Sequence, residues 1–314
     1  MDPVRAIADA VLYEGYVLWP YTRSAMKNQQ RFTWGGVYPL GWREDRSELV
    51  VQCLVAGDTD GEMGLDVRAR FLHVVRRQVH DASGEAVDEL TVDGERHLSW
   101  DEAVEREIVA GAGPFSVPAG REEEALEGGA GTLVRSWEPL GGTLSVDTQD
   151  LRPGLRRLTV RIANTTPWDG GPRDATLRRT LCSTHAVLRV SDGAFVSLAD
   201  PPAEFADAAL GCRQEGLWPV LVGEPSEHHT VLASPIILDD HPEIAAESPG
   251  DLFDGGEIDG LLVLSILALT DEEKAEMRAS DPRTREILER TEALTPEQRM
   301  ALHGTVRELA VRRS

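Results

Sequence analysis

Leu155-Arg-Arg-Leu-Thr-Val-Arg-Ile-Ala-Asn164 is the stretch of sequence that decides the fold class. Within it the apolar residues Leu158, Val160 and Ile162 alternate with arginine and threonine. Alternation with a period of two places the apolar side chains on one face of an extended chain and the polar ones on the other. Such a strand is typical of an antiparallel sheet that has one face on a core.

Strand-like segments also occur on both sides of this stretch. We expect further strands at 47–56, 65–80, 132–138, 143–147, 174–190 and 234–238. Residues 194–198 would return from a turn at Asp192-Gly193 as the second strand of a hairpin. Because strands and helices do not alternate along the chain, a Rossmann-like fold is disfavoured. The expected fold class is α+β, mainly antiparallel β, arranged as a sandwich or a partly closed sheet.

Helices are expected at both ends of the chain. Asp2-Pro3 combines an N-cap with a proline at the first helical position, and apolar residues follow at helical spacing. Toward the C-terminus, three capping signals predict helices at about 271–279, 282–292 and 296–311. The last of these carries an apolar stripe that either covers the sheet or meets another subunit, so a homo-oligomer through this helix is one alternative.

The domain organisation that we expect has two parts. Residues 1–270 would form a mainly β globular domain with an N-terminal helix, and residues 271–314 a helical segment packed on it. Residues 81–131, rich in Gly, Glu, Asp and Ala, predict an excursion from the main sheet. Within it, Ser99-Trp-Asp-Glu102 predicts a capping box that opens a short helix ending at Val109, and 121–131 predicts a mobile segment.

Composition excludes several classes of function. The chain has 314 residues, is 41% hydrophobic and carries a formal net charge of −22. The length allows a large buried core, while the charge opposes binding to nucleic acid or to an anionic membrane surface. No apolar run reaches the roughly 18 residues of a membrane span, and the first residues lack the pattern of a secretory signal. Three widely spaced cysteines argue against a disulfide framework, so we expect a cytoplasmic protein.

One stretch of unusual composition runs from Val231 to Asp259 and is dense in acids, prolines and glycines. No Lys or Arg occurs between Gln214 and Glu273, so this region presents a negative field. Oxygen ligands on a loop at a strand end can bind a hard cation, and a neighbouring carboxylate can orient a histidine. A divalent metal site would use Asp239, Asp240, His241, Glu243, Asp251 and Asp254. The spacing matches no established metal motif, and the alternative is a solvated connector with turn-forming acids.

A second unusual stretch, residues 13–42, holds all four tyrosines and three of the seven tryptophans. Amphipathic rings are enriched at interfaces and in ligand pockets, although the segment could equally pack as part of the core. Because this stretch is also basic, we predict that it packs against the acidic stretch. The predicted ligand or partner surface consists of Tyr13, Glu14, Tyr16, Trp19, Tyr21, Arg23, Lys27, Asn28, Arg31 and Trp34.

Familiar catalytic motifs give no support for an enzyme class. The sequence contains no Walker loop, no dinucleotide-binding glycine motif, no GxSxG elbow and no HExxH helix. Cys182 and His185 lie three residues apart in a predicted strand, which places their side chains on opposite faces and disfavours a shared zinc. Cys212, His228 and His229 could add ligands but are not closely paired. No base is identified for a Cys/His nucleophilic pair.

Four segments carry a resemblance to a known family. They are VLYEGYVLWPYTRSAMKNQQRFTWGGVYP (11–39), STHAVLRVSDGAFVSLADPP (183–202), GLWPVLVGEPSEHHTVLASPIILDDHPEIAAESPGDLFDGGEID (216–259) and LTDEEKAEMRASDP (269–282). The chain resembles uncharacterised bacterial proteins associated with actinobacterial gene clusters for [NiFe]-hydrogenases. The resemblance implies a role in making, assembling or accompanying that enzyme, with a hydrogenase subunit or maturation factor as the protein partner. It supplies no catalytic residues.

Three functions therefore stay open. The leading hypothesis is an accessory or scaffold protein without catalytic activity and without a cofactor. The second is a metal-dependent enzyme or metallochaperone that uses the acidic loop 239–259. The third is a small-molecule binding module lined by the aromatic segment 13–42.

Overall fold

The computed structural model describes residues 5, 7–9, 12, 34–57, 63–111, 113–242, 266–267, 269–279 and 282–295. The chain divides into two compact units. The first comprises residues 1–18 and 30–243, and the second comprises residues 19–29 and 244–314. Strands dominate the first unit and helices the described part of the second, which confirms the expected α+β class.

One sheet of the first unit has the strand order β13-β1-β11-β10-β7, with β14 added beside β1, and all its pairings are antiparallel. The alternating stretch 155–164 is its central strand, β11, in which Val160 lies opposite Val51 on one side and Val146 on the other. The strands of this sheet are β1 (Glu48–Ala56), β7 (Pro114–Val117), β10 (Leu140–Arg152), β11 (Leu155–Asn164), β13 (Ala194–Val196) and β14 (Gln214–Glu215).

A second antiparallel sheet has the order β15-β16-β12-β2-β9-β8, with β3 and β6 also paired to β2. Its longest strand, β2, pairs with β12 through residues 65–72 and with β9 through residues 76–81. The strands of this sheet are β2 (Leu65–Asp81), β3 (Ala86–Val87), β6 (Trp100–Val109), β8 (Gly120–Ala125), β9 (Gly131–Trp137), β12 (Cys182–Val190), β15 (Trp218–Leu221) and β16 (Thr230–Ser234). A separate two-stranded hairpin is formed by β4 (Glu89–Val92) and β5 (Glu95–Leu98).

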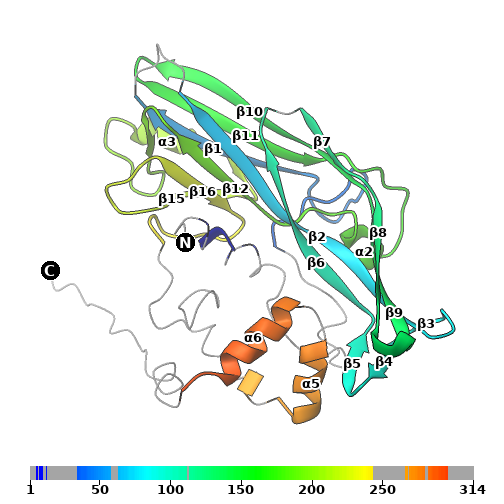
Figure 1. Ribbon diagram of the computed structural model, residues 1–314. Coiled ribbons are helices and arrows are strands. Elements are labelled where there is room, and N and C mark those ends of the chain that lie inside the picture. The colour runs from blue at the N-terminus through cyan, green and yellow to red at the C-terminus, as the bar shows by residue number, and fades with distance from the viewer. Residues whose placement is uncertain are drawn as a thin grey trace. The chain divides into compact units, whose positions relative to one another are not determined.

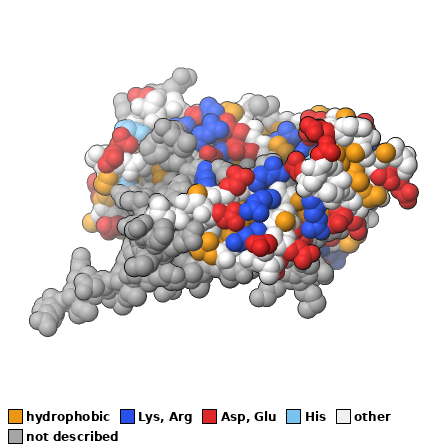
Figure 2. Space-filling view, turned by 60° about the horizontal axis from the view of Figure 1, so that its bottom comes forward, with side chains coloured by type: hydrophobic (Ala, Val, Ile, Leu, Met, Phe, Trp, Pro, Cys, Tyr) orange, Lys and Arg blue, Asp and Glu red, His pale blue; other side chains and the backbone are white. Residues whose placement is uncertain are grey.

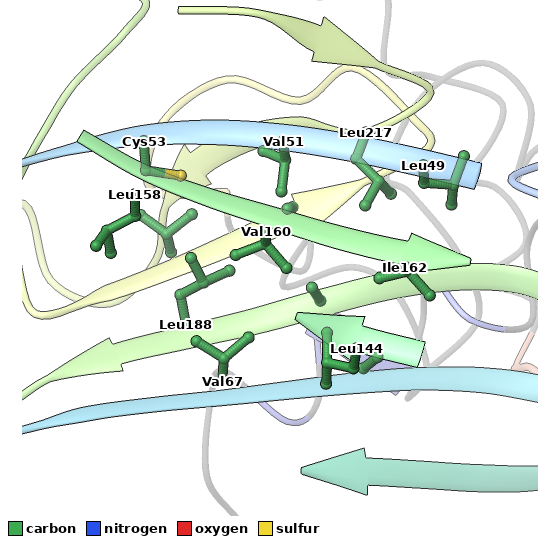
Figure 3. Packing of buried hydrophobic residues seen from close by; sticks show 14 of the residues in the cluster. Leu49, Val51, Cys53, Val67, Leu144, Leu158, Val160, Ile162, Leu188 and Leu217 are labelled. Carbon is green, nitrogen blue, oxygen red and sulfur yellow. The ribbon is translucent and has the colours of Figure 1, made fainter. Parts of the chain in front are cut away.

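The main core lies between the two sheets, which face one another (Figure 1). Figure 3 shows apolar side chains of β1 and β11 pointing toward those of β2 and β12. Burying one such Leu, Val or Ile side chain stabilises the fold by about 1.5–3 kcal/mol, so this layer is the main source of stability. The labelled residues are Leu49, Val51, Cys53, Val67, Leu144, Leu158, Val160, Ile162, Leu188 and Leu217.

The outer face of the second sheet is covered by the N-terminal helix, of which residues 5, 7–9 and 12 are described. Ala8 packs with Val187 and Leu232, and Leu12 packs with Leu72 and Cys182. On the inner face, beyond the main core, a smaller core forms where the β4–β5 hairpin covers the end of β2.

Several strand and helix predictions are wrong in informative ways. The segment predicted as a helix to Val109 is β6, and 121–125 lie inside β8 rather than in a mobile segment. Within 81–131, β3, β6 and β8 belong to the second sheet, β7 belongs to the first sheet, and β4 and β5 form the separate hairpin. Residues 173–177 form helix α2 (Arg173–Leu177), and β12 begins only at Cys182.

The return strand predicted after Asp192-Gly193 pairs with β1 instead of β12, so the chain crosses between the sheets there. The strand predicted at 234–238 is misplaced: β16 spans Thr230–Ser234 and ends before Pro235, which lacks a backbone donor, and 235–238 are not a strand.

Short helices complete the described part of the chain. The first unit also holds α3 (Ala206–Leu210) and the 3-10 turn η2 (Glu127–Gly129). In the second unit, α5 (Asp271–Ala279) and α6 (Pro282–Glu292) confirm two of the predicted C-terminal helices. The predicted capping box is present, since Thr270 and Glu273 exchange side chain to backbone hydrogen bonds of 2.8 and 3.2 Å.

An ion pair joins the two helices α5 and α6 of the second unit. Arg278 on α5 pairs with Glu292 of α6 at 2.5 Å. The third predicted helix, 296–311, lies outside the described residues, and the packing of 271–314 on the β domain stays a prediction. Among the helices that the structure describes, none is long and apolar enough to cross a bilayer.

Candidate functional site

The described part of the acidic stretch, residues 231–242, is held against the edge strand β15. One carboxylate oxygen of Asp240 accepts a hydrogen bond from the backbone N–H of Leu221 at 2.7 Å, and the other accepts one from Ser197 Oγ at 2.6 Å. The N–H of His241 donates to the carbonyl of Leu221 at 2.7 Å. Each oxygen of Asp240 therefore accepts one hydrogen bond, and the two bonds brace the segment.

His241, by contrast, faces a second histidine. Its ring lies edge-on to that of His228, with the centroids 6.0 Å apart. His241 Nδ1 is 3.0 Å from the Gly223 carbonyl oxygen, and His228 Nδ1 is 3.3 Å from that of Phe195. A carbonyl oxygen only accepts, so in the neutral rings Nδ1 carries the proton and Nε2 keeps its lone pair. This is how histidines that bind metals are commonly oriented.

The remaining predicted metal ligands do not complete a site. Asp239 is exposed, while Glu243, Asp251 and Asp254 lie outside the described residues. Over the described ranges, no group of three or more His, Cys, Asp or Glu side chains is arranged to hold a metal ion. Cys212 packs in a separate cluster around Leu54 and Leu155.

Of the predicted aromatic surface, only Trp34 is described; Tyr13, Glu14, Tyr16, Trp19, Tyr21, Arg23, Lys27, Asn28 and Arg31 lie outside the described residues. The end of that stretch packs in the core. Tyr38 is buried and stacks on Trp42 with 6.1 Å between ring centroids, and Trp42 meets Trp168 edge-on at 6.2 Å. Val37 and Tyr38 therefore belong to the core, whereas Leu40 is 69% exposed.

The described ends of the two unusual stretches lie side by side. Gly35 has a φ of +62°, and a β-carbon placed on it would come within 2.6 Å of Pro235 Cβ. The carbonyl of Gly35 also accepts a hydrogen bond of 2.9 Å from the N–H of Thr184. The predicted pairing of Arg23, Lys27 and Arg31 with the acids falls on residues outside the described ranges and stays a prediction.

A β-bulge at the start of β12 corrects the prediction for Cys182 and His185. Ser183 has a φ of +50°, and the register shifts so that Cys182 lies opposite Leu72 and His185 opposite Arg70. Leu72 and Arg70 point to one face of β2, so the bulge places Cys182 and His185 on the same face as well. The sequence pattern alone gives no sign of the extra residue.

Charge around this bulge is buried and internally paired. Arg70 is buried and binds Asp9 of the N-terminal helix and Glu105 of β6. Burial, followed by the positive charge of Arg70, lowers the pKa of His185 to about 3. The imidazole is therefore neutral, and the cluster fixes the helix on the sheet.

A charged network lies on the opposite, inner face of the second sheet, between the main core and the smaller core. Glu102 accepts from Arg77 Nη1 through one oxygen and from Arg135 Nε through the other, both at 2.9 Å. Arg77 also donates to the carbonyl of Leu98 at 3.1 Å, and Arg135 to Glu124 at 2.8 Å. Because Glu102 and Arg77 are buried, their pairing is required for stability.

Beside this network lie three side chains that the sequence did not single out: His73 on β2, Arg106 on β6 and Trp137 on β9. Arg106 lies over the Trp137 ring, with its guanidinium carbon 5.8 Å from the ring centroid. His73 is fully buried; among the described residues neither ring nitrogen makes a hydrogen bond of normal geometry, although the backbone of Glu138 lies close enough to favour the charged ring. Burial, followed by the charge of Arg106, lowers the pKa of His73 to about 4. The cluster was missed because β6 was predicted as a helix.

Arginines and carboxylates alternate on the surface as they do in these networks. Figure 2 shows Lys and Arg side chains bordered by Asp and Glu side chains on one face of the molecule. On β2 and β6, for example, Arg68 pairs with Glu107 at 2.9 Å across the strands. Such exposed pairs contribute little to stability and mainly keep the surface charged.

Comparison with known proteins adds no assignment: no protein-family model matches the chain, and no curated protein matches its sequence significantly.

Proposed function

We propose that this chain is a cytoplasmic accessory protein without catalytic activity, which binds a protein partner where the two unusual stretches adjoin. The contact between Gly35 and Pro235 carries this proposal, because it brings the described ends of both stretches to one place on the sandwich. The resemblance of the four segments makes a [NiFe]-hydrogenase subunit or maturation factor the first partner to look for.

Next to Pro235 the surface is both apolar and acidic. Ile236 and Leu238 pack inward, and Ile237 between them is 72% exposed. Asp239 is exposed as well, and Asp240 braces the segment from within. A braced segment loses little conformational entropy when a partner binds, which favours an interface.

Co-purification tests the proposal. The tagged full-length chain is expressed in cells that make a [NiFe]-hydrogenase, cross-linked and purified, and its partners are identified by mass spectrometry. Ile237→Asp should abolish recovery of a hydrogenase subunit or maturation factor. Leu210→Asp is the matched control, because Leu210 on α3 is an 85% exposed aliphatic residue that belongs to neither stretch. Recovery of the chain alone as a monomer, or equal recovery with both variants, would overturn the proposal.

A second candidate function, metal binding as in a metallochaperone, is favoured by the paired rings of His228 and His241. Imidazole nitrogens suit Ni²⁺ and Zn²⁺ better than Mg²⁺ and Ca²⁺. Isothermal titration of the full-length chain with each of the four ions should therefore give heat for Ni²⁺ or Zn²⁺ only. His241→Asn should remove that heat, since Asn tolerates the φ of +55° at this position, and His229→Asn should not. No heat with any ion would dismiss this candidate.

A further inference from the structure

Arg106 differs from the other buried or half-buried arginines of its neighbourhood. Arg70, Arg77 and Arg135 each have a carboxylate partner on an adjacent strand or on the N-terminal helix. Arg106 is half-buried, its Nε is buried without a partner among the described residues, and its guanidinium lies over the Trp137 ring. A half-buried guanidinium that pairs with none of the described carboxylates is unusual in a chain with a net charge of −22.

The indole ring of Trp137 is held in one position beside this guanidinium. Its indole N–H donates to the carbonyl of Pro118 at 3.1 Å. On the neighbouring strand β8, Gly120 lies so close that a β-carbon there would come within 2.2 Å of the indole ring. The ring is thereby held in place, and a guanidinium over an aromatic face keeps its N–H groups available for a carboxylate.

His73 lies on the same face of the sheet as Arg106. Cross-strand pairing sets His73 opposite Val104 and Arg106 opposite Phe71, so His73 and Arg106 are neighbours on the inner face of β2 and β6. Within the described part of the chain neither ring nitrogen makes a hydrogen bond of normal geometry, but the backbone of Glu138 lies close to the ring and favours its charged form. Val104 is 39% exposed, which leaves the surface beside Arg106 accessible.

The charge at this place decides the kind of ligand. Glu102 and Glu124, the carboxylates of the adjoining network, are already paired with Arg77 and Arg135, and Glu138 next to Trp137 is paired with Arg179. Arg106 therefore leaves a single positive charge to be matched, which favours a monoanion over a dianion in this acidic protein. Val104 and Trp137 offer apolar surface to the rest of the ligand.

We infer that Arg106, Trp137 and His73 form a binding site for a small monocarboxylate with an apolar body. Arg106 binds the carboxylate through its N–H groups, Trp137 and Val104 contact the apolar part, and the buried ring of His73 lies beside Arg106 on the same face. This inference is independent of the proposed partner function.

Saturation-transfer NMR and isothermal titration of the full-length chain test the site with acetate, butyrate and benzoate, and with phosphate and sulfate as dianions. Butyrate or benzoate should bind more tightly than acetate, and phosphate and sulfate should bind at least tenfold more weakly. Arg106→Gln should weaken binding at least tenfold. Arg76→Gln is the matched control, because Arg76 is an exposed arginine on the outer face of the same sheet, and should leave affinity unchanged.

Stability must be separated from binding in this test. If Arg106→Gln does not fold by circular dichroism, Arg106→Lys replaces it, and a weakened affinity is again expected because lysine lacks the planar fork. Absence of monocarboxylate binding up to about 10 mM, a range that covers even weak sites, would overturn the inference. Equal binding by wild type and by the folded Arg106 variant, or preference for phosphate, would also overturn it.

Discussion

The α-carbon of Gly35 lies against the ring of Pro235, closely enough that a β-carbon at residue 35 would come within 2.6 Å of Pro235 Cβ. Residue 35 also needs the left-handed φ of +62°, which glycine adopts without strain. These two requirements are independent, and together they fix how the end of the aromatic stretch joins the end of β16.

Gly35→Ala should destabilise the fold through both requirements. Gly84→Ala is the control, because Gly84 has a φ of +83° but no atom within 4 Å of the place that a β-carbon would take. Left-handed backbone strain alone should cost about 1–2 kcal/mol at Gly84. The contact with Pro235 should add about 1–3 kcal/mol at Gly35. Urea unfolding measures both, and equal losses would contradict the close contact with Pro235.

Glu102→Gln should be among the most destabilising single changes in the second sheet. It leaves Arg77 and Arg135 without their shared carboxylate inside the protein, which should cost about 3–5 kcal/mol in the free energy of unfolding. Glu123→Gln removes only an exposed pair with Arg121 and should cost less than about 1 kcal/mol. Similar losses for the two variants would show that the Glu102 network is not buried as described.

Glu102 also shows why some elements of the fold can be predicted from the sequence and others cannot. The alternation in β11 and the capping signals of α5 and α6 are local, and local patterns were interpreted correctly. Ser99-Trp-Asp-Glu102 imitates a capping box, but Glu102 binds Arg77 and Ser99 Oγ accepts from the N–H of Val79 at 2.9 Å. Contacts between segments distant in sequence therefore overrode the local signal.

In the candidate sites, too, local sequence patterns predict some features, while features that depend on contacts between distant segments are missed. His241 was identified from its acidic surroundings, but its partner His228 lies on the other side of β16 in the sequence and was considered only with Cys212. The Ser183 bulge and the neighbourhood of His73 and Arg106 depend on strand register, and no single-strand pattern contains that information.

Thiol labelling should report the burial of the cysteines. Burial raises the pKa of the Cys53 thiol strongly and also raises that of Cys212, while Cys182 is buried at the bulge. Since the thiolate is the reactive form, a thiol reagent should label the native chain slowly at all three positions and rapidly once urea unfolds it. Mass spectrometry identifies the modified residue, and fast native labelling of Cys53 would contradict its place in the main core.

Acid should destabilise the fold through the two buried histidines. The pKa is lowered from 6.5 to about 4 at His73 and to about 3 at His185, so the unfolded chain binds protons that the folded chain does not. Stability is therefore fully present above pH 6.5 and falls as the pH is lowered toward 4, by up to about 1.4 kcal/mol per pH unit for each histidine. Urea unfolding at pH 7, 6, 5 and 4.5 measures this slope.

His73→Gln should reduce the slope of stability against pH by up to about 1.4 kcal/mol per pH unit, which corresponds to one proton. It removes one of the two groups that take up a proton only in the unfolded chain. His229→Gln removes an exposed imidazole and serves as the matched control for the loss of a histidine. An unchanged slope in a folded His73→Gln chain would show that His73 takes up its proton in the native state. In that case the ring would be accessible to solvent rather than enclosed between β2 and β6.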